Sequence, residues 1–279
     1  MQLRKYSKNY TSQSGEDGIL EKIFEILPPG SRFCVEFGAW DGKYLSNCYH
    51  LIFDKGWRGV MIEADKKKFK KLQHHYKEKP DVILVNQRVD FEGNTLDIIL
   101  QKTTAPKDID LLSIDIDGND YHVWESLKEY APKVVVVEFN PMIPQDIEFV
   151  QERNMEINQG TSLLSMVNLG KTKGYELIAV TTFNAIFVKQ EYYGLFEIED
   201  NNISALFHLK YKAPSAFVLY DGTVCLSGNL YDPWRRRVIN PLDLQYYPKF
   251  FRFFQDTQNP KRKIKVLNFL YLMYRKIKG

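Results

Sequence analysis

The sequence predicts an α/β protein built on a doubly wound, mostly parallel sheet, with an antiparallel C-terminal hairpin and an aromatic-rich C-terminal extension. Five apolar runs of strand length alternate with helical stretches between residues 33 and 141. The runs are apolar almost throughout, as expected for parallel strands that helices cover on both faces. Two further runs, 175–181 and 184–190, follow each other closely enough to form a hairpin at the sheet edge. Together these features indicate the doubly wound architecture.

The individual elements are predicted from periodicity and from the residues that end each run. Short apolar runs indicate strands, and apolar residues that recur every three to four positions indicate helices. We expect strands at 33–38, 59–65, 81–87, 109–117 and 133–141, and helices at 16–27, 44–53, 66–76, 94–103, 121–131 and 161–174. Residues 191–255 are aromatic-rich and irregular, with a second candidate hairpin at 214–228 around Asp221-Gly222.

Composition and charge limit the classes of function. The chain is 44% hydrophobic and 26% charged, which fits a globular protein, and no apolar run is long enough to span a membrane. The three cysteines are widely spaced without a CxxC pair, and the N-terminus has no apolar signal core. These features argue against a disulfide framework or a cysteine zinc site, and we expect a cytoplasmic protein.

The net charge of +3 hides an asymmetry. Residues 261–279 hold seven basic residues and no acidic one, while the rest of the chain holds 31 basic and 35 acidic residues. A mildly acidic body disfavours nucleic-acid binding. The tail could lie on an anionic membrane, at the inner face of the cell membrane, or it could be a docked helix with a basic end.

Ligands of an open α/β sheet bind beyond the carboxyl ends of its strands. The first strand leads into Glu36-Phe37-Gly38-Ala39-Trp40-Asp41-Gly42, where the glycines permit a tight turn and a close approach to a ligand. Glu63, at the end of the second strand, is placed to bind ribose hydroxyls. The alternatives are a plain turn and a helix cap, for which Asp65 is better suited. The GxGxxG fingerprint of NAD enzymes is absent, and Glu36 suits a cationic ligand such as the sulfonium of S-adenosylmethionine.

Five motifs in order carry a family resemblance. VEFGAWDG, Leu45-Ser46-Asn47, MIEAD, DLLSIDIDGND and VVVVEFNP resemble those of the class I S-adenosylmethionine-dependent methyltransferases, which have a Rossmann-like fold. Within this class the chain is most similar to the FkbM-type group, over about residues 12–193. The resemblance implies that Glu63 holds the ribose, that Asp90 contacts the adenine, and that Asp115 and Asp117 lie beside the transferable methyl. It also implies that Glu36, Gly38 and Asp41 line the methionine end of the cofactor with Ser46 and Asn47 nearby, and that Ala39 and Asp115 are cofactor-binding residues.

The cluster from Asp115 to Asp120 has three interpretations that the sequence leaves open. It could be a turn and helix cap. It could supply a general base, from Asp115 or Asp117, with His122 as a further candidate catalytic residue. Alternatively, Asp117 could join Glu138 and Asn140 to hold Mg²⁺ or another divalent cation, because such hard oxygen ligands suit these ions.

The resulting expectation is an O-methyltransferase that acts on a hydroxyl of a sugar, glycan precursor or similar polyol. The alternatives are a divalent-metal-assisted methyltransferase, a catalytically inactive binding module of the same fold, and, as a weaker one, an NAD-linked oxidoreductase. The expected segments are an N-terminal helix or lid at 1–30, the cofactor-binding domain at 31–190, a substrate-side extension at 191–260 and a basic C-terminal helix at 261–279. The expected partner is a small-molecule or glycan acceptor, and the oligomeric state is left open.

Overall fold

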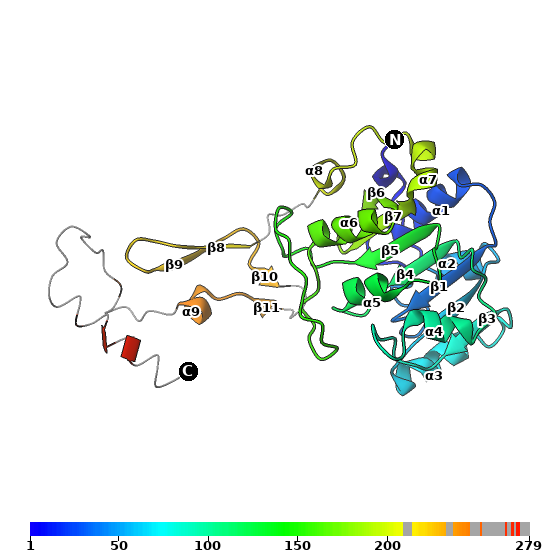
Figure 1. The fold of residues 1–279 in the computed structure, drawn as a ribbon, viewed down its shortest axis with the longest axis horizontal. Coiled ribbons are helices and arrows are strands. Elements are labelled where there is room, and N and C mark those ends of the chain that lie inside the picture. The colour runs from blue at the N-terminus through cyan, green and yellow to red at the C-terminus, as the bar shows by residue number, and fades with distance from the viewer. Residues whose placement is uncertain are drawn as a thin grey trace. The chain divides into compact units, whose positions relative to one another are not determined.

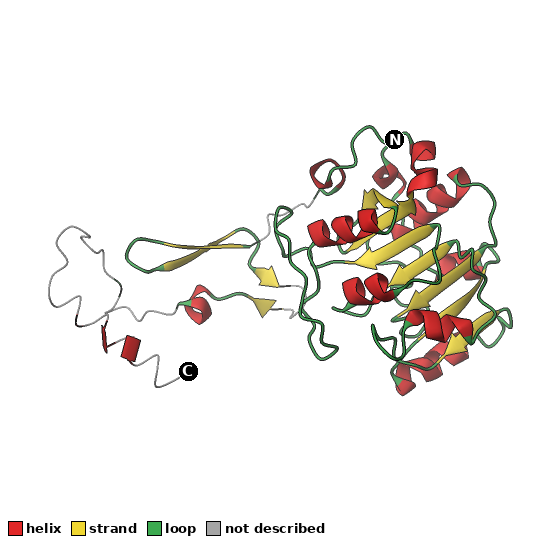
Figure 2. Ribbon diagram, in the orientation of Figure 1, coloured by secondary structure: helices red, strands yellow, loops and turns green. Residues whose placement is uncertain are grey.

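The computed structural model describes residues 1–208, 214–232, 237–245, 252, 266, 269–270 and 272–273. The chain divides into two compact units, Met1–Leu209 and Lys210–Gly279. The division between the units falls within the extension that was predicted for 191–260. The first unit contains the sheet, and Figures 1 and 2 show helices on both faces of that sheet.

The first unit is built on one seven-stranded sheet. The strands are β1 Phe33–Phe37, β2 Arg58–Ile62, β3 Val82–Val85, β4 Leu111–Ile114, β5 Val134–Glu138, β6 Tyr175–Val180 and β7 Asn184–Lys189. Their order is β3-β2-β1-β4-β5-β7-β6. The first five strands are parallel, and β7 pairs antiparallel with both β5 and β6. The predicted parallel sheet and its antiparallel hairpin are therefore confirmed.

Helices cover both faces of this sheet. They are η1 Leu3–Tyr6, α1 Glu16–Ile26, α2 Tyr49–Phe53, α3 Lys66–His75, α4 Leu96–Gln101, α5 Asp120–Ser126, α6 Leu163–Thr172, α7 Gln190–Tyr193, η2 Gly194–Phe196 and α8 Ile203–Leu206. Apolar residues of α4, α5 and α6 pack on one face. Those of α1, α2 and α3 pack on the other.

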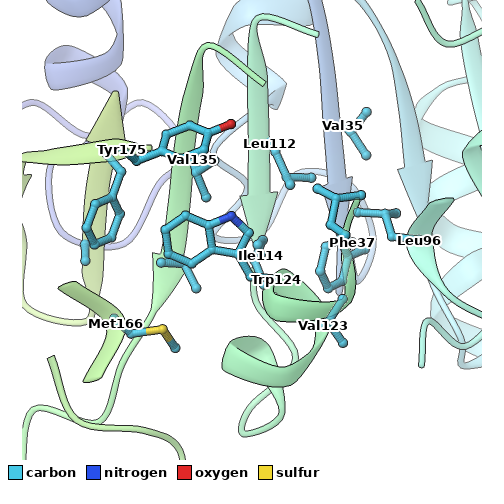
Figure 3. Close-up of a cluster of buried hydrophobic side chains, with 14 of the residues drawn as sticks. Val35, Phe37, Leu96, Leu112, Ile114, Val123, Trp124, Val135, Met166 and Tyr175 are labelled. Atoms are coloured by element: carbon cyan, nitrogen blue, oxygen red, sulfur yellow. The ribbon is translucent and has the colours of Figure 1, made fainter. Parts of the chain in front are cut away.

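The core under α4, α5 and α6 is organised around Trp124 of α5. Figure 3 shows Trp124 in the middle of this cluster of apolar side chains. Its ring centroid lies 5.8 Å from that of Tyr175 and 5.1 Å from that of Phe187, so α5 is fixed against β6 and β7. This packing positions the start of α5, where the acidic cluster lies.

Two predicted helices are shorter than expected. The helix predicted at 44–53 begins only at Tyr49, because the buried Glu36 carboxylate binds Ser46 and the N–H of Asn47 and holds residues 44–48 as a loop. The helix predicted at 121–131 ends at Ser126, because the Asp97 carboxylate accepts the N–H groups of Lys128 and Glu129 at 2.8 and 3.0 Å. Both limits are set by buried carboxylates from other elements.

The second unit contains the hairpin that was predicted around Asp221-Gly222. Strands β8 Ser215–Val218 and β9 Val224–Ser227 pair antiparallel, as do β10 Tyr231–Asp232 and β11 Arg237–Val238. A short helix, α9 Pro241–Leu244, follows. Within the predicted basic helix at 261–279, residues 266, 269–270 and 272–273 are helical and exposed, and the seven basic residues lie outside the described residues. No helix in the described part of the chain has the length and apolar character needed to cross a membrane.

Candidate active site

The glycine loop, residues 38–48, connects β1 to α2 at the carboxyl edge of the sheet. Gly38 has φ +75° and lies so close to the chain after β4 that a Cβ there would be 1.6 Å from the carbonyl oxygen of Asp115. Ala39 donates its N–H to the carbonyl oxygen of Ile62, the last residue of β2, at 3.1 Å. The loop is therefore held between the ends of β2 and β4, next to the point where the strand order reverses.

Glu63 follows β2 and is buried, at 5% exposure. Its Oε2 accepts the N–H of Trp40 at 2.8 Å, and its Oε1 accepts the N–H of Asp65 at 2.6 Å. Asp65 itself caps α3 by accepting the N–H groups of Lys67 and Lys68. Glu63 thus ties the glycine loop to the start of α3, and the second lone pair of each oxygen is what the predicted ribose contact would use.

Glu36 holds the far end of the glycine loop. It lies in β1, and its Oε2 accepts the hydroxyl of Ser46 at 2.5 Å while its Oε1 accepts the N–H of Asn47 at 2.8 Å. Burial raises the pKa of Glu36 to about 7, against the effect of these two hydrogen bonds. The Asn47 amide also donates to Ser113 of β4 at 3.0 Å. Three of the predicted cofactor residues, Glu36, Ser46 and Asn47, therefore form one connected group.

Asp41 and Asp90 lie in loops on the same edge of the sheet. Asp41 Oδ1 accepts the N–H groups of Lys43 and Tyr44, at 3.0 and 2.8 Å. Asp90 Oδ1 accepts the N–H of Phe91 at 2.7 Å, in the connection between β3 and α4. Both side chains are half-buried and shape their own turns, and the cofactor contacts assigned to them remain predictions.

An acidic cluster lies at the ends of β4 and β5. Asp115 and Asp117 follow β4, and Glu138 is the last residue of β5. One carboxylate oxygen from each of the three lies within 4.8 Å of the others. Asp117 is exposed, Asp115 is half-buried, and Glu138 is buried with no hydrogen-bond partner for its Oε2. Because the carbonyl of Asp115 lies against Gly38, the cluster borders the glycine loop.

The carboxyl groups of this cluster affect one another's protonation. Burial, with the charges of Asp120, Asp117 and Glu36, raises the pKa of Asp115 to about 8. Burial, with the charges of Asp115, Asp120 and Asp117, raises the pKa of Glu138 well above its ordinary value. The cluster is therefore suited to hold a proton or a cation.

Asp120 and Asn140 serve the turns beside the cluster. Asp120 accepts the N–H groups of Ile116 and Gly118, both at 2.9 Å, and so closes the turn in which Asp117 has φ +59°. Of the three interpretations of the cluster, the turn and helix cap therefore applies to Asp120. Asn140 accepts the N–H of Met142 at 2.9 Å and donates to the carbonyl of Gln159 at 2.7 Å. Its amide is used by the loop after β5, and the three carboxylates that lie together are those of Asp115, Asp117 and Glu138.

His122 lies on α5, after the aspartates of this cluster in the sequence. It is 7% exposed, and its Nε2 lies 2.9 Å from the carbonyl oxygen of Gln151. Its ring packs edge-on against Phe91 at 5.6 Å. His122 therefore connects α5 to the loop after β5, and the structure does not place it among the three clustered carboxylates.

The first turn of α1 brings further polar residues to this edge. Glu16 Oε1 accepts the Thr181 hydroxyl at 2.5 Å and the Asn184 amide at 3.0 Å. Asn184 in turn is the register partner of Glu138 across β5 and β7. Asn184 is not among the predicted site residues, although a polar residue at the start of the apolar run NAIFV could have indicated it.

One segment of the sheet-containing unit is similar to a known family of methyltransferases. Residues 84–177 match the model of the methyltransferase FkbM domain. Over this segment the chain is similar to the FkbM-type methyltransferases. Methyltransferases of this class take the methyl group from S-adenosylmethionine, as the sequence motifs predict. The FkbM match runs from β3 to β6, so it includes the acidic cluster, and the glycine loop and Glu63 lie before it.

Several solved structures are similar to this chain at low identity. One is the citrinin polyketide synthase CMeT domain, at 14% identity and TM-score 0.42, covering 62% of this chain and 50% of that one. Another is the N-terminal domain of EvdMO1 with SAH bound, at 12% identity and TM-score 0.43, covering 64% and 82%. A SAM-dependent methyltransferase from Aquifex aeolicus gives 11% identity and TM-score 0.37, covering 60% and 86%. The chain thus spans half the length of the first of these. No curated protein matches the chain.

The residues present fit S-adenosylmethionine as the cofactor. S-adenosylmethionine carries a sulfonium and an ammonium group, and the buried charged residues at this edge are acidic: Glu16, Asp17, Glu36, Glu63, Asp120 and Glu138. Among the described residues no lysine or arginine is buried. The charge of the site is therefore complementary to that of the cofactor.

Proposed function

We propose that this methyltransferase acts on a hydroxyl of a sugar, glycan precursor or similar polyol. The observation that supports the proposal is the cluster of Asp115, Asp117 and Glu138 next to the glycine loop. A hydroxyl must lose its proton as its oxygen takes the methyl group, and a positioned carboxylate can accept that proton.

The chain's residues would divide the work as follows. Bound S-adenosylmethionine supplies an electrophilic methyl group. The glycine loop and Glu63 hold the donor, and the end of β4 holds the acceptor, so that the two are aligned for in-line transfer. Asp115 or Asp117 takes the hydroxyl proton. The exposed position of Asp117 suits contact with an acceptor that enters from solvent.

The chemistry of the cluster favours a neutral, hydroxyl-rich acceptor. Hydroxyl groups donate hydrogen bonds to carboxylates, whereas a carboxylate or phosphate at the reacting position would be repelled by three acidic side chains. Residues 191–260, including the hairpin β8–β9, would form the substrate-side extension.

A metal-assisted reaction is the second candidate, and a specific observation favours it. Three carboxylate oxygens lie within 4.8 Å of one another, and Glu138 Oε2 is buried without a partner. Asp115, Asp117 and Glu138 would hold Mg²⁺ or a similar divalent ion, which lowers the pKa of a bound hydroxyl. Asn140 is the other predicted ligand. To bind the ion, its Oδ1 would have to release the N–H of Met142 or accept that hydrogen bond and bind the ion at the same time.

One assay tests the proposal and separates the two routes. The enzyme is incubated with S-adenosylmethionine and a panel of nucleotide sugars, free sugars and polyols, and mass spectrometry detects products that have gained one methyl group. Methylation of a hydroxyl supports the proposal, and methylation confined to nitrogen or carbon acceptors contradicts it. Turnover that a chelator abolishes and added Mg²⁺ restores identifies the metal route, and turnover that a chelator leaves unchanged identifies a plain carboxylate base.

We also propose a cytoplasmic enzyme whose residues 261–279 contact the inner face of the membrane. Cys34, Cys48 and Cys225 are free thiols in the structure, which suits a reducing compartment. The seven basic residues of the tail are complementary to anionic lipids. Fractionation of cells that express the protein tests this: recovery with the cytoplasmic face of the cell membrane supports it, and recovery outside the cell contradicts it.

A further inference from the structure

Asp17, on the first turn of α1, has one carboxylate oxygen that is fully used and one that is not used at all. Its Oδ2 accepts the N–H groups of Tyr10, Thr11 and Ser12, at 2.7, 2.7 and 2.8 Å. Its Oδ1 is buried and has no hydrogen-bond partner. The residue is 2% exposed, so water does not satisfy this oxygen from outside. A buried carboxylate oxygen without a donor is costly, which indicates that a ligand supplies the donor.

Asp17 lies beside the residues that hold the glycine loop. The segment that it anchors contacts the loop directly, because the Thr11 hydroxyl donates to the carbonyl of Ser46 at 3.1 Å. Ser46 in turn donates to Glu36. The charge of Asp17 is close enough to raise the pKa of both Glu36 and Cys48. The segment that Asp17 anchors is thus in contact with the end of the loop where the methionine part of the cofactor is expected.

The surroundings contain an excess of acceptors over donors. Other buried oxygens near this edge also lack a partner, among them Asn47 Oδ1, Glu138 Oε2 and Asn184 Oδ1. The orientation of Asn184 is fixed, since its amide nitrogen donates to Glu16. Among the described residues no buried lysine or arginine could supply the missing positive charge. A ligand that suits this place carries a positive charge and several N–H donors.

We infer that Asp17 is a cofactor-binding residue whose Oδ1 receives the α-ammonium group of S-adenosylmethionine. The inference rests on the proposed cofactor. Each oxygen of Glu36 already accepts one hydrogen bond, from Ser46 or Asn47, whereas Asp17 Oδ1 accepts none and has both lone pairs free for the ligand. Asp17 also anchors residues 10–12, which contact Ser46. Cofactor binding to Asp17 would therefore also hold the N-terminal segment in place.

The test compares two ligands that differ in this ammonium group. S-adenosylhomocysteine has it, and 5′-methylthioadenosine keeps the nucleoside and sulfur but lacks the amino-acid part. Asp17→Asn should weaken S-adenosylhomocysteine binding by roughly 10- to 100-fold, the effect of losing a charged hydrogen bond, and should leave 5′-methylthioadenosine binding unchanged. Equal loss for both ligands, or no loss for either, overturns the inference. Wild-type protein that binds neither ligand refutes the proposed function instead.

Glu16→Gln is the matched control. Glu16 neighbours Asp17 in the same helical turn and is equally buried, but both its oxygens have partners within the protein, in Ser14, Thr181 and Asn184. Its substitution should not discriminate between the two ligands. If Asp17→Asn does not fold, Asp17→Glu keeps the charge but displaces the oxygen by one methylene, and the same selective loss is expected. Absence of selectivity in that variant overturns the inference as well.

Discussion

Carboxyl groups at the carboxyl edge of the sheet differ in what their oxygens accept, and this difference suggests their roles. Both oxygens of Glu63 hold backbone N–H groups, and those of Glu36 hold one hydroxyl and one N–H. These two side chains shape the loop that would receive the cofactor. Asp17 and Glu138 each retain a buried oxygen without a partner. Such oxygens are where we expect ligand atoms, because burial without a donor is costly.

Glu63→Ala should weaken cofactor binding. The substitution removes the acceptor for the predicted ribose hydroxyls and also frees the N–H of Trp40 in the glycine loop. We expect a loss of about 1–3 kcal/mol in the binding free energy of S-adenosylhomocysteine, measured by calorimetry. Glu78→Ala, at an exposed position, is the control and should bind normally. An unchanged affinity in folded Glu63→Ala would exclude this residue from the site.

Asp115→Asn should change how the stability of the ligand-free protein depends on pH. Burial, with the charges of Asp120, Asp117 and Glu36, raises the pKa of Asp115 from 3.8 to about 8, so the folded state binds this proton more tightly than the unfolded state does. Asp115 therefore contributes a decline in wild-type stability as the pH rises from about 4 to about 8, and the asparagine variant lacks this contribution. The variant should match the wild type near pH 4 and exceed it near pH 8, by on the order of 1–3 kcal/mol. Denaturant titrations at both pH values measure this, and an equal difference at both would contradict it.

At the scale of elements, the site depends on how closely β1 and β4 end against each other. Gly38 passes the chain over the carbonyl of Asp115 with no room for a side chain. Glu36 and Ser113, which are register partners on these two strands, then receive the far end of the same loop. The geometry of the loop and of the acidic cluster is therefore set together.

Gly38→Ala should disrupt this arrangement. The new Cβ would lie 1.6 Å from the Asp115 carbonyl oxygen, so the end of β4 must move, and φ +75° is strained for alanine. Gly56→Ala is the matched control. Gly56 has φ +69°, and a Cβ added there would meet no atom within 4 Å, so this variant should lose only the backbone strain energy, about 1–2 kcal/mol. We expect Gly38→Ala to cost clearly more in denaturant stability and to abolish binding of S-adenosylhomocysteine. Equal costs for the two variants would show that the close approach is unimportant.

The elements were predictable wherever one local pattern decided them. Continuous apolar runs and helical periodicity identified all seven strands of the large sheet and the helices α1, α3, α4 and α6. The ends of α2 and α5 were not predictable, because Glu36 and Asp97 act on them from distant positions in the chain. The same holds for the site: the motifs indicated Asp115, Asp117 and Glu138, but only the fold shows that the Asn140 amide is used by its own loop and that Asn184 faces Glu138.

On the scale of the whole molecule, charge is divided along the chain. The seven basic residues of 261–279 stand against a remainder with four more acidic than basic residues. Val266, Phe269, Leu270, Leu272 and Met273, within the same segment, are exposed. A short segment with both basic and exposed apolar residues can bind an anionic interface, where the headgroups meet the charges and the acyl boundary accepts the apolar side chains.

Deletion of residues 261–279 should therefore separate membrane attachment from cofactor binding. The glycine loop and the acidic cluster lie within Met1–Leu209, so affinity for S-adenosylhomocysteine should be unchanged. Co-sedimentation with vesicles that contain anionic lipids should fall strongly, since each basic residue near such a surface contributes about 1 kcal/mol. Added salt should reduce binding of the intact protein in the same way, because it screens these charges. Vesicle binding that deletion leaves unchanged would refute the membrane contact, and loss of folding on deletion would instead show that the segment is a docked structural helix.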